Sequence, residues 1–160
     1  MKQVWWTLSL IVCALTGSVA AATDFFCDDT PSCPAVICGG CVSWLDTGYN
    51  FGNTFQNAPR TFETGVGCMA NVTHRVLDMW LTDCTYDDEW SGTVYNDLPF
   101  DMNKFDEVAV DIVFAPKVSL HGPGPRVATA VFCVQSLNDG SYSYCEMFLS
   151  GYARPGLISR

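Results

Sequence analysis

Apolar residues between Cys68 and Cys84 recur every three or four positions, the period of an α-helix. One side of a helical projection holds Met69, Val72, Val76, Leu77, Trp80 and Leu81, and the opposite side holds Asn71, His74, Arg75, Asp78 and Thr82. A helix rises about 1.5 Å per residue, so its end cysteines would lie roughly 24 Å apart, too far for a disulfide. The pattern predicts the main helix of the protein, with His74 on its solvent side and no bond between Cys68 and Cys84.

The second half of the chain alternates apolar and polar residues, which is typical of half-buried strands. Strands are predicted at residues 108–114, 126–137 and 141–152, with a short edge strand at 117–121. Together with the helix they predict an α+β fold, in which one main helix packs on an antiparallel sheet of about three to five strands. An all-β sandwich is the alternative if the helical spacing is misleading.

The N-terminus has the order of a secretory signal: an early charge at Lys2, an apolar run from Val4 to Leu15, and small residues up to Ala22. An uncleaved membrane anchor is the alternative, but the run is short against the roughly 20 residues that span a bilayer. The C-terminus carries no hydrophobic tail that a lipid anchor would replace. The sequence therefore predicts a signal peptide at residues 1–22 and a secreted, extracellular protein without a membrane anchor.

The cysteines support this interpretation. Removal of the signal peptide takes Cys13 from the nine cysteines and leaves an even set, 9 − 1 = 8: Cys27, Cys33, Cys38, Cys41, Cys68, Cys84, Cys133 and Cys145. In an oxidising compartment these predict a disulfide-braced protein. Residues 23–45 are expected to form a cysteine-rich coil that folds as one unit with the α+β region at 46–160.

One pairing follows from the turn at residues 138–140. A three-residue loop with Gly140 in the left-handed conformation places Leu137 opposite Ser141, and it then places Cys133 directly across from Cys145. A two-residue turn would miss this alignment by one residue. We therefore predict a Cys133–Cys145 disulfide, while the other pairings stay open, with the N-terminal cysteines tied to both ends of the helix.

The charge restricts the class of partner. Seventeen acidic side chains against eight basic ones give a net charge of −9, which disfavours nucleic acid because the phosphates would be repelled. Hydrophobic residues make up 49% of the chain, which indicates a globular protein. Asn71 lies in the sequon Asn-Val-Thr and is predicted to be glycosylated if the host is a eukaryote.

The sequence contains no convincing motif for a metal site or a redox site. Cys38 and Cys41 have the spacing of a dithiol redox motif, but they lack the βαβ context of such a site, and disulfides are expected instead. His74 and His121 are the only histidines and both are distant in sequence from these cysteines, and an oxidising compartment favours disulfides over the thiolates that zinc requires. The acidic run at residues 87–89 lacks the alternating spacing of a calcium loop and predicts a solvated turn. We expect no metal and no cofactor.

Glu89, His121 and Arg126 are the candidates for catalysis. A Glu–His acid/base pair with an arginine to hold phosphate is the chemistry of RNA cleavage through a 2′,3′-cyclic intermediate. Residues 86–90 and 123–127 resemble the Glu-containing and Arg-containing segments of small secreted fungal guanyl ribonucleases. The chain departs from that family because it has no histidine in its last two strands, so the resemblance implies a ribonuclease-like scaffold with weak or lost activity.

The function predicted from the sequence is non-catalytic recognition outside the cell, as an effector or ligand-binding factor. The expected partner is an extracellular protein or a glycan, and the expected state is a monomer. Trp90 and Tyr95 lie in a polar linker and are the predicted contact residues, whereas Trp44 and Trp80 are expected to be buried. A small secreted hydrolase with a ribonuclease-like fold is the alternative.

Overall fold

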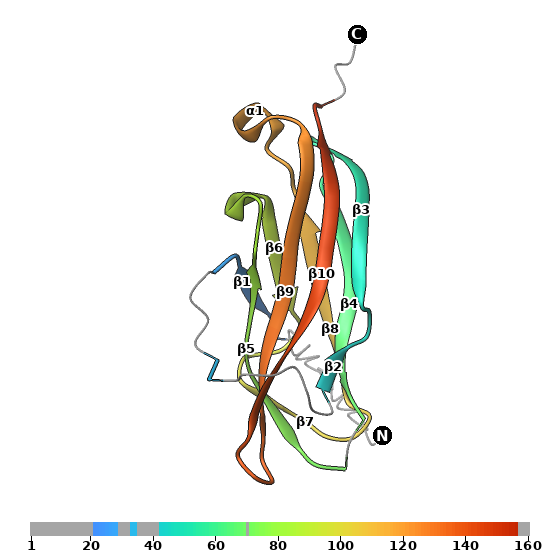
Figure 1. The fold of residues 1–160 in the computed structure, drawn as a ribbon. Coiled ribbons are helices and arrows are strands. Elements are labelled where there is room, and N and C mark those ends of the chain that lie inside the picture. Colours follow the sequence, from blue (N-terminus) through green and yellow to red (C-terminus); the bar gives the residue numbers. More distant parts are fainter. Residues whose placement is uncertain (1–20, 29–32, 35–41, 70, 157–160) are drawn as a thin grey trace, which may run out of the picture.

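The computed structural model describes residues 21–28, 33–34, 42–69 and 71–156. Nearly all of the predicted signal peptide falls outside these ranges, as do Cys38 and Cys41. The described chain forms two five-stranded sheets that face each other across one hydrophobic core (Figure 1). No helix in this part of the chain is long and apolar enough to cross a membrane.

Within the described ranges, the sandwich consists of ten strands and two short helical turns. Sheet A has the order β1 (Thr23–Phe26), β6 (Trp90–Val94), β8 (Glu107–Phe114), β4 (Arg60–Cys68), β2 (Val42–Trp44). Sheet B has the order β3 (Gly48–Phe55), β10 (Tyr142–Arg154), β9 (Gly124–Ser136), β5 (His74–Thr82), β7 (Phe100–Met102). A 3₁₀ turn, η1 (Asp87–Glu89), precedes β6, and a short helix, α1 (Val118–His121), connects β8 to β9.

The predicted α+β class with one main helix is wrong, because residues 74–82 form β5, a strand of sheet B. The two-sheet sandwich that stood as the alternative is the arrangement found. The strands predicted at 108–114, 126–137 and 141–152 correspond to β8, β9 and β10. The edge strand expected at 117–121 is instead the helical turn α1.

A β-bulge explains the helical spacing in β5. The ladder between β5 and β9 shifts by one residue between Val76 and Asp78, which leaves Leu77 as an extra residue. A bulge of this kind reverses the alternation of side chains along the strand. Val76 before the bulge and Met79 after it therefore both reach the core, although they are three positions apart.

The outer face of β5 is covered as well. Trp80 points away from the core of the sandwich but is only 6% exposed, because it packs with Val131 and Cys133 and against Cys33 and Tyr144. A strand that is buried on both faces carries apolar residues on both and loses the alternating pattern. The bulge and the burial of the outer face together explain why the apolar residues of β5 recur at a helix-like spacing.

The loop between β9 and β10 is one residue longer than predicted. The N–H of Gly140 donates to the carbonyl of Ser136, and the N–H of Ser136 donates to the carbonyl of Ser141, so that residues 137–140 form the connection. The carboxylate of Asp139 accepts from the N–H and the hydroxyl of Ser141, at 3.0 and 2.7 Å. These two bonds, with the hydroxyl bond first, lower the pKa of Asp139 from 3.8 to about 2.

The extra loop residue moves the two cysteines to opposite faces of sheet B. Cys133 pairs with Tyr144 across the ladder and Cys145 with Phe132. A shift of one residue reverses which face a side chain occupies, and Cys145 accordingly lies in the core while Cys133 belongs to the outer cluster. The predicted Cys133–Cys145 disulfide is wrong, and Cys133 is bonded to Cys33 instead.

Two disulfides join cysteines of the N-terminal region to the loop after β5 and to β9. β1 and β2, in the region predicted to be a coil, are the two opposite edges of sheet A. Cys33, which lies between them in the sequence, is bonded to Cys133 on the outer face of sheet B, and Cys27 is bonded to Cys84. β1 and β2 therefore lie at opposite edges of sheet A, while Cys33, between them in the sequence, is held against sheet B. The prediction that Cys68 and Cys84 are not bonded to each other is confirmed, because Cys84 is bonded to Cys27. The reason given for it, a helix between them, was wrong.

Removal of the Cys33–Cys133 bond is expected to destabilise the fold. This disulfide joins residues 100 positions apart, and its loss in the double alanine variant should cost at least about 2–4 kcal/mol, the range typical of disulfides, since long loops gain most. Urea denaturation followed by tryptophan fluorescence measures the loss, with Trp80 as a neighbouring reporter. An unchanged midpoint would show that the bond does not hold the segment in place.

Asp139 should make stability depend on pH in the acid range. Its pKa is about 2 in the folded protein against 3.8 ordinarily, so its contribution is complete above pH 3.8 and is lost as the pH falls toward 2. The difference in unfolding free energy between the wild type and Asp139→Ala should therefore shrink over that interval. A difference that stays constant from pH 5 to pH 2 would contradict this assignment.

Candidate functional site

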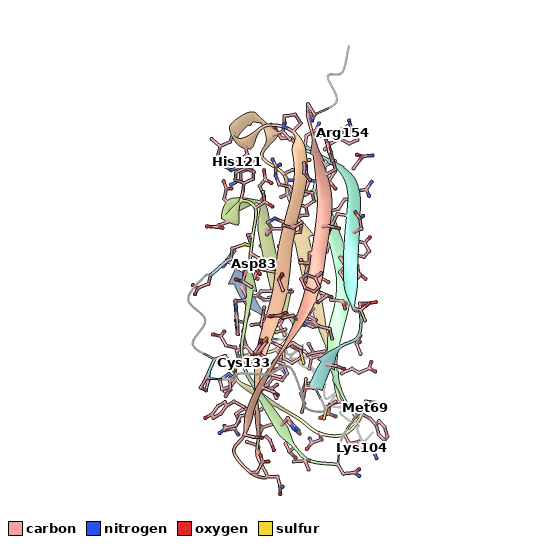
Figure 2. The ribbon with its side chains drawn as sticks, in the orientation of Figure 1. Met69, Asp83, Lys104, His121, Cys133 and Arg154 are labelled. Atoms are coloured by element: carbon pink, nitrogen blue, oxygen red, sulfur yellow. A yellow bond between two sulfur atoms is a disulfide. The ribbon has the colours of Figure 1, made fainter. Side chains whose placement is uncertain are left out.

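The three residues proposed for catalysis lie together at one end of the sandwich. Glu89 ends η1, His121 ends α1 and Arg126 is near the start of β9. Figure 2 shows His121 at this end, beside the turn that carries the acidic run. Tyr86 precedes η1, and its ring connects the other members of the group.

Glu89 and Arg126 form a buried ion pair. Arg126 Nε donates to Glu89 Oε2 at 2.5 Å, and the side chains are 3% and 0% exposed for Arg126 and Glu89. Glu89 Oε1 also accepts the backbone N–H of Lys117 at 2.7 Å, and Arg126 Nη2 donates to the carbonyl of Gly122 at 2.7 Å. A buried pair is tolerated only when its remaining donors and acceptors find partners, as they do here.

A second, exposed set of contacts lies above this pair. The rings of Tyr86 and His121 stack with their centroids 4.0 Å apart, and the Arg126 guanidinium lies 4.5 Å from the centre of the Tyr86 ring. Asp88 binds Lys117 Nζ at 3.0 Å and His121 Nε2 at 2.8 Å. These two bonds, that of Lys117 first, hold the pKa of the Asp88 carboxyl below its ordinary value.

In this geometry Glu89 and Arg126 are partners of each other and are closed to solvent. An open depression covers this end of the molecule, and of the three candidates only His121 lines it. Glu89 has no exposed surface and already accepts from Arg126 and Lys117, so it has no access to a substrate proton. Arg126 is equally engaged and has no exposed group to offer a phosphate.

The predicted contact residues differ in their exposure. Trp90 is only 3% exposed, because it stacks on Phe114 in the core, so the prediction that it forms a contact face is wrong. Tyr95 is 46% exposed, and its hydroxyl donates to Asp111 at 2.6 Å, a bond that raises the pKa of Tyr95. Trp44 is buried, as predicted, and its indole N–H donates to the carbonyl of Cys145.

The remaining sequence candidates lie elsewhere. His74 is not on a helix surface but at the start of β5, where it is 7% exposed with Nδ1 2.8 Å from the carbonyl of Val72. Asn71 is exposed in the bend before β5, where a glycan would have room. Cys27, Cys84 and Asp87 bring ligand atoms within 4.8 Å of one another, but the two sulfurs are joined in a disulfide and are not available to a metal.

An exposed patch that was not predicted from the sequence lies on the outer face of sheet B. Val127 is 51% exposed, Phe148 68% and Tyr152 40%. The register pairs Ser150 with Val127, and Phe148 and Tyr152 flank Ser150 on the same face. We call these three side chains the open patch. The spacing of Phe148 and Tyr152, four residues apart within a strand, is a signal that could have revealed it.

A depression adjoins the open patch at the edge of sheet B. Its lining comes from β3 and β10: Asn50, Gly52, Asn53, Ser150, Gly151 and Tyr152. Tyr152 therefore belongs both to the open patch and to this depression.

The comparisons with known proteins identify a fold and no family. No protein-family model matches the chain, and no curated protein is similar to it. Among solved structures, the human CEP192 ASH/PapD-like domain 7 matches with a TM-score of 0.54 at 11% identity, over 81% of this chain and 93% of that one. The periplasmic chaperone SfaE matches with a TM-score of 0.50 at 9% identity, over 74% of this chain and 59% of that one.

These likenesses concern the fold alone: the chain shares a β-sandwich with PapD-like domains and does not have the predicted α+β fold. The chain spans 59% of the length of the chaperone that it matches. The disulfides, together with the likeness to a periplasmic protein, are compatible with an extracellular or periplasmic location.

The structural role of the ion pair can be tested by breaking it and by replacing it. Arg126→Met leaves Glu89 buried without its charge partner and should cost about 3–5 kcal/mol, whereas the double variant with Glu89→Leu should recover most of that loss. Asp88→Asn, which breaks an exposed pair, should cost about 0–1 kcal/mol. Chemical denaturation measures all three. Full stability of Arg126→Met would mean that the pair does not support the fold.

Proposed function

We propose that this protein is a secreted, non-catalytic recognition module that binds an extracellular protein or glycan through the open patch. The observation that carries the proposal is the adjacency of Val127, Phe148 and Tyr152 on one face of sheet B. Single exposed apolar residues are common, but adjacent ones mark interaction sites. The patch lies on two long, paired strands, which hold its side chains in fixed positions.

The cluster around Glu89 and Arg126 lies at the same end of sheet B as the open patch, since Arg126 directly precedes Val127 in β9, and its contacts favour binding over hydrolysis. Glu89 and Arg126 are committed to each other, and His121 is stacked on Tyr86 and bonded to Asp88. Of the three candidates of the hydrolase alternative, only His121 lines the depression, and the carboxylate beside it, Asp88, already binds both His121 and Lys117. One of the structural neighbours is a chaperone, and chaperones act by binding, which is in line with this proposal.

Phe148 should be the main contact residue of the patch. Phe148→Ser is expected to weaken binding about tenfold or more on arrays of extracellular proteins and glycans, because it removes the largest exposed apolar surface of the patch. Phe105→Ser is the matched control, since both phenylalanines are 68% exposed and Phe105 adjoins Lys104 at the opposite end of the molecule (Figure 2). The control should bind like the wild type, and both variants should keep its melting temperature.

Two results would contradict the proposal. One is a set of ligands that bind the wild type and Phe148→Ser equally. The other is cleavage of RNA by the purified protein above the background of a His121→Ala control, which would favour the hydrolase alternative.

A further inference from the structure

A strip of this acidic protein carries no acidic residue. Residues 47–62 and 147–156 contain two arginines, Arg60 and Arg154, and no Asp or Glu, although the chain as a whole has a net charge of −9. The two segments are distant in sequence, but β3 and β10 pair in parallel and bring them together at the edge of sheet B. Local charge at this edge is therefore opposite in sign to the charge of the whole chain.

The depression described above lies within this strip and has a volume of about 290 Å³. It forms at a bulge, because Asn50 pairs with Ser150 and Asn53 with Tyr152, so that two residues of β3 lie opposite one of β10. Gly52 takes a φ of +61° in the bulge, and its N–H donates to Asn50 Oδ1 at 2.8 Å. A left-handed glycine at this position lets the strand bend away and open the depression.

The lining offers mainly hydrogen-bond donors. The amide oxygen of Asn50 accepts from the N–H of Gly52, and that of Asn53 accepts from Arg154 Nε at 3.0 Å. The NH₂ group of each amide is then the part left to bind a ligand. Arg60 Nη1 donates to the carbonyl of Phe51 and lies 3.7 Å from where a Cβ would stand on Gly52. An occupant with several acceptor oxygens would match this set.

The two arginines keep charge available for an anion. Within the part of the chain that the structure describes, the ion pairs involve other basic residues, namely Arg75, Lys117, His121 and Arg126. Glu146 is the nearest acidic residue along β10, and four residues of strand place it roughly 13 Å from Ser150. Arg154 also lies over the Tyr152 ring, with Cζ 4.8 Å from the ring centre, which holds the guanidinium beside the depression.

We infer that the depression binds an acidic sugar unit of an extracellular polysaccharide. The guanidinium of Arg154 pairs with the sugar carboxylate, the amide groups of Asn50 and Asn53 donate to its hydroxyls, and the Tyr152 ring packs against a face of the sugar ring. A polyuronate carries one carboxylate per sugar, a lower charge density than nucleic acid, and so it is less strongly repelled by the rest of the protein. The inference rests on the proposed function and names its ligand class.

The test is a calorimetric titration of the whole disulfide-bonded protein with polygalacturonate. Arg154→Gln should weaken binding about tenfold, because a charge-assisted hydrogen bond is lost. Arg75→Gln is the matched control: it changes the net charge equally, but Arg75 is paired with Asp101 on β7 and lies outside the depression. Asn53→Ala removes an amide donor without a change of charge and should also weaken binding. Methyl-esterified polygalacturonate, which keeps the sugar but loses the carboxylate charge, should bind at least tenfold more weakly than the acid form.

Three results would overturn the inference: no binding of polygalacturonate, equal affinity for the esterified polymer, or equal weakening by Arg154→Gln and Arg75→Gln. The last would indicate attraction by overall charge and not by this depression. The proposed function is separable, because array ligands that depend on Phe148 would uphold it even if polygalacturonate failed to bind.

Discussion

The two sheets of the sandwich are joined at one end by an ion pair without access to water. Glu89 stands at the entry to β6 in sheet A, and Arg126 lies in β9 of sheet B, so their contact crosses the core. Removing two charges from water costs several kcal/mol for each, and only a complete set of partners offsets it. Those partners come from the connection between β8 and β9, the N–H of Lys117 and the carbonyl of Gly122. The same bonds fix the path of α1, which is why residues 117–121 turn instead of extending sheet A or sheet B as an edge strand.

The outer face of sheet B has two halves that differ in what covers them. Over one half, Trp80 and Val131 are buried together with the Cys33–Cys133 disulfide. Over the other half, Phe148 is 68% exposed among the residues that the structure describes. Both halves present apolar side chains, so the difference arises from the cover and not from the composition of the strands. A partner that packs on Phe148 would bury its apolar surface, as Cys33 helps to bury Trp80 on the other half of the face.

The sequence predicted the strands that have one buried face and one solvent-exposed face. An example is β8, in which Val110, Ile112 and Phe114 point into the core. It failed at β5 because a bulge and a second covered face removed the alternation. The loop at 137–140 could not be predicted to the residue, since Gly140 in a left-handed conformation suits loops of different lengths, and one residue decided the face of Cys133. At the candidate site, residue type alone suggested that Glu89, His121 and Arg126 act as acid, base and phosphate-binding group. In the structure Glu89 and Arg126 are buried and form an ion pair with each other. No local pattern in a sequence reports such a contact between residues 37 positions apart.

Net charge misleads in the same way, because it averages over segments that the fold separates or joins. The acid-free strip exists because the parallel pairing of β3 with β10 places two remote segments side by side. The same pairing contains the bulge at Gly52, and the depression lined by Asn50 and Asn53 lies at that bulge. The lack of acidic residues, the amide donors and the shape of the depression therefore all depend on the pairing of β3 with β10. Since the lining comes from β3 and β10 and not from long loops, little conformational entropy has to be lost on binding, and even a shallow depression can then select a ligand by the placement of its acceptor oxygens.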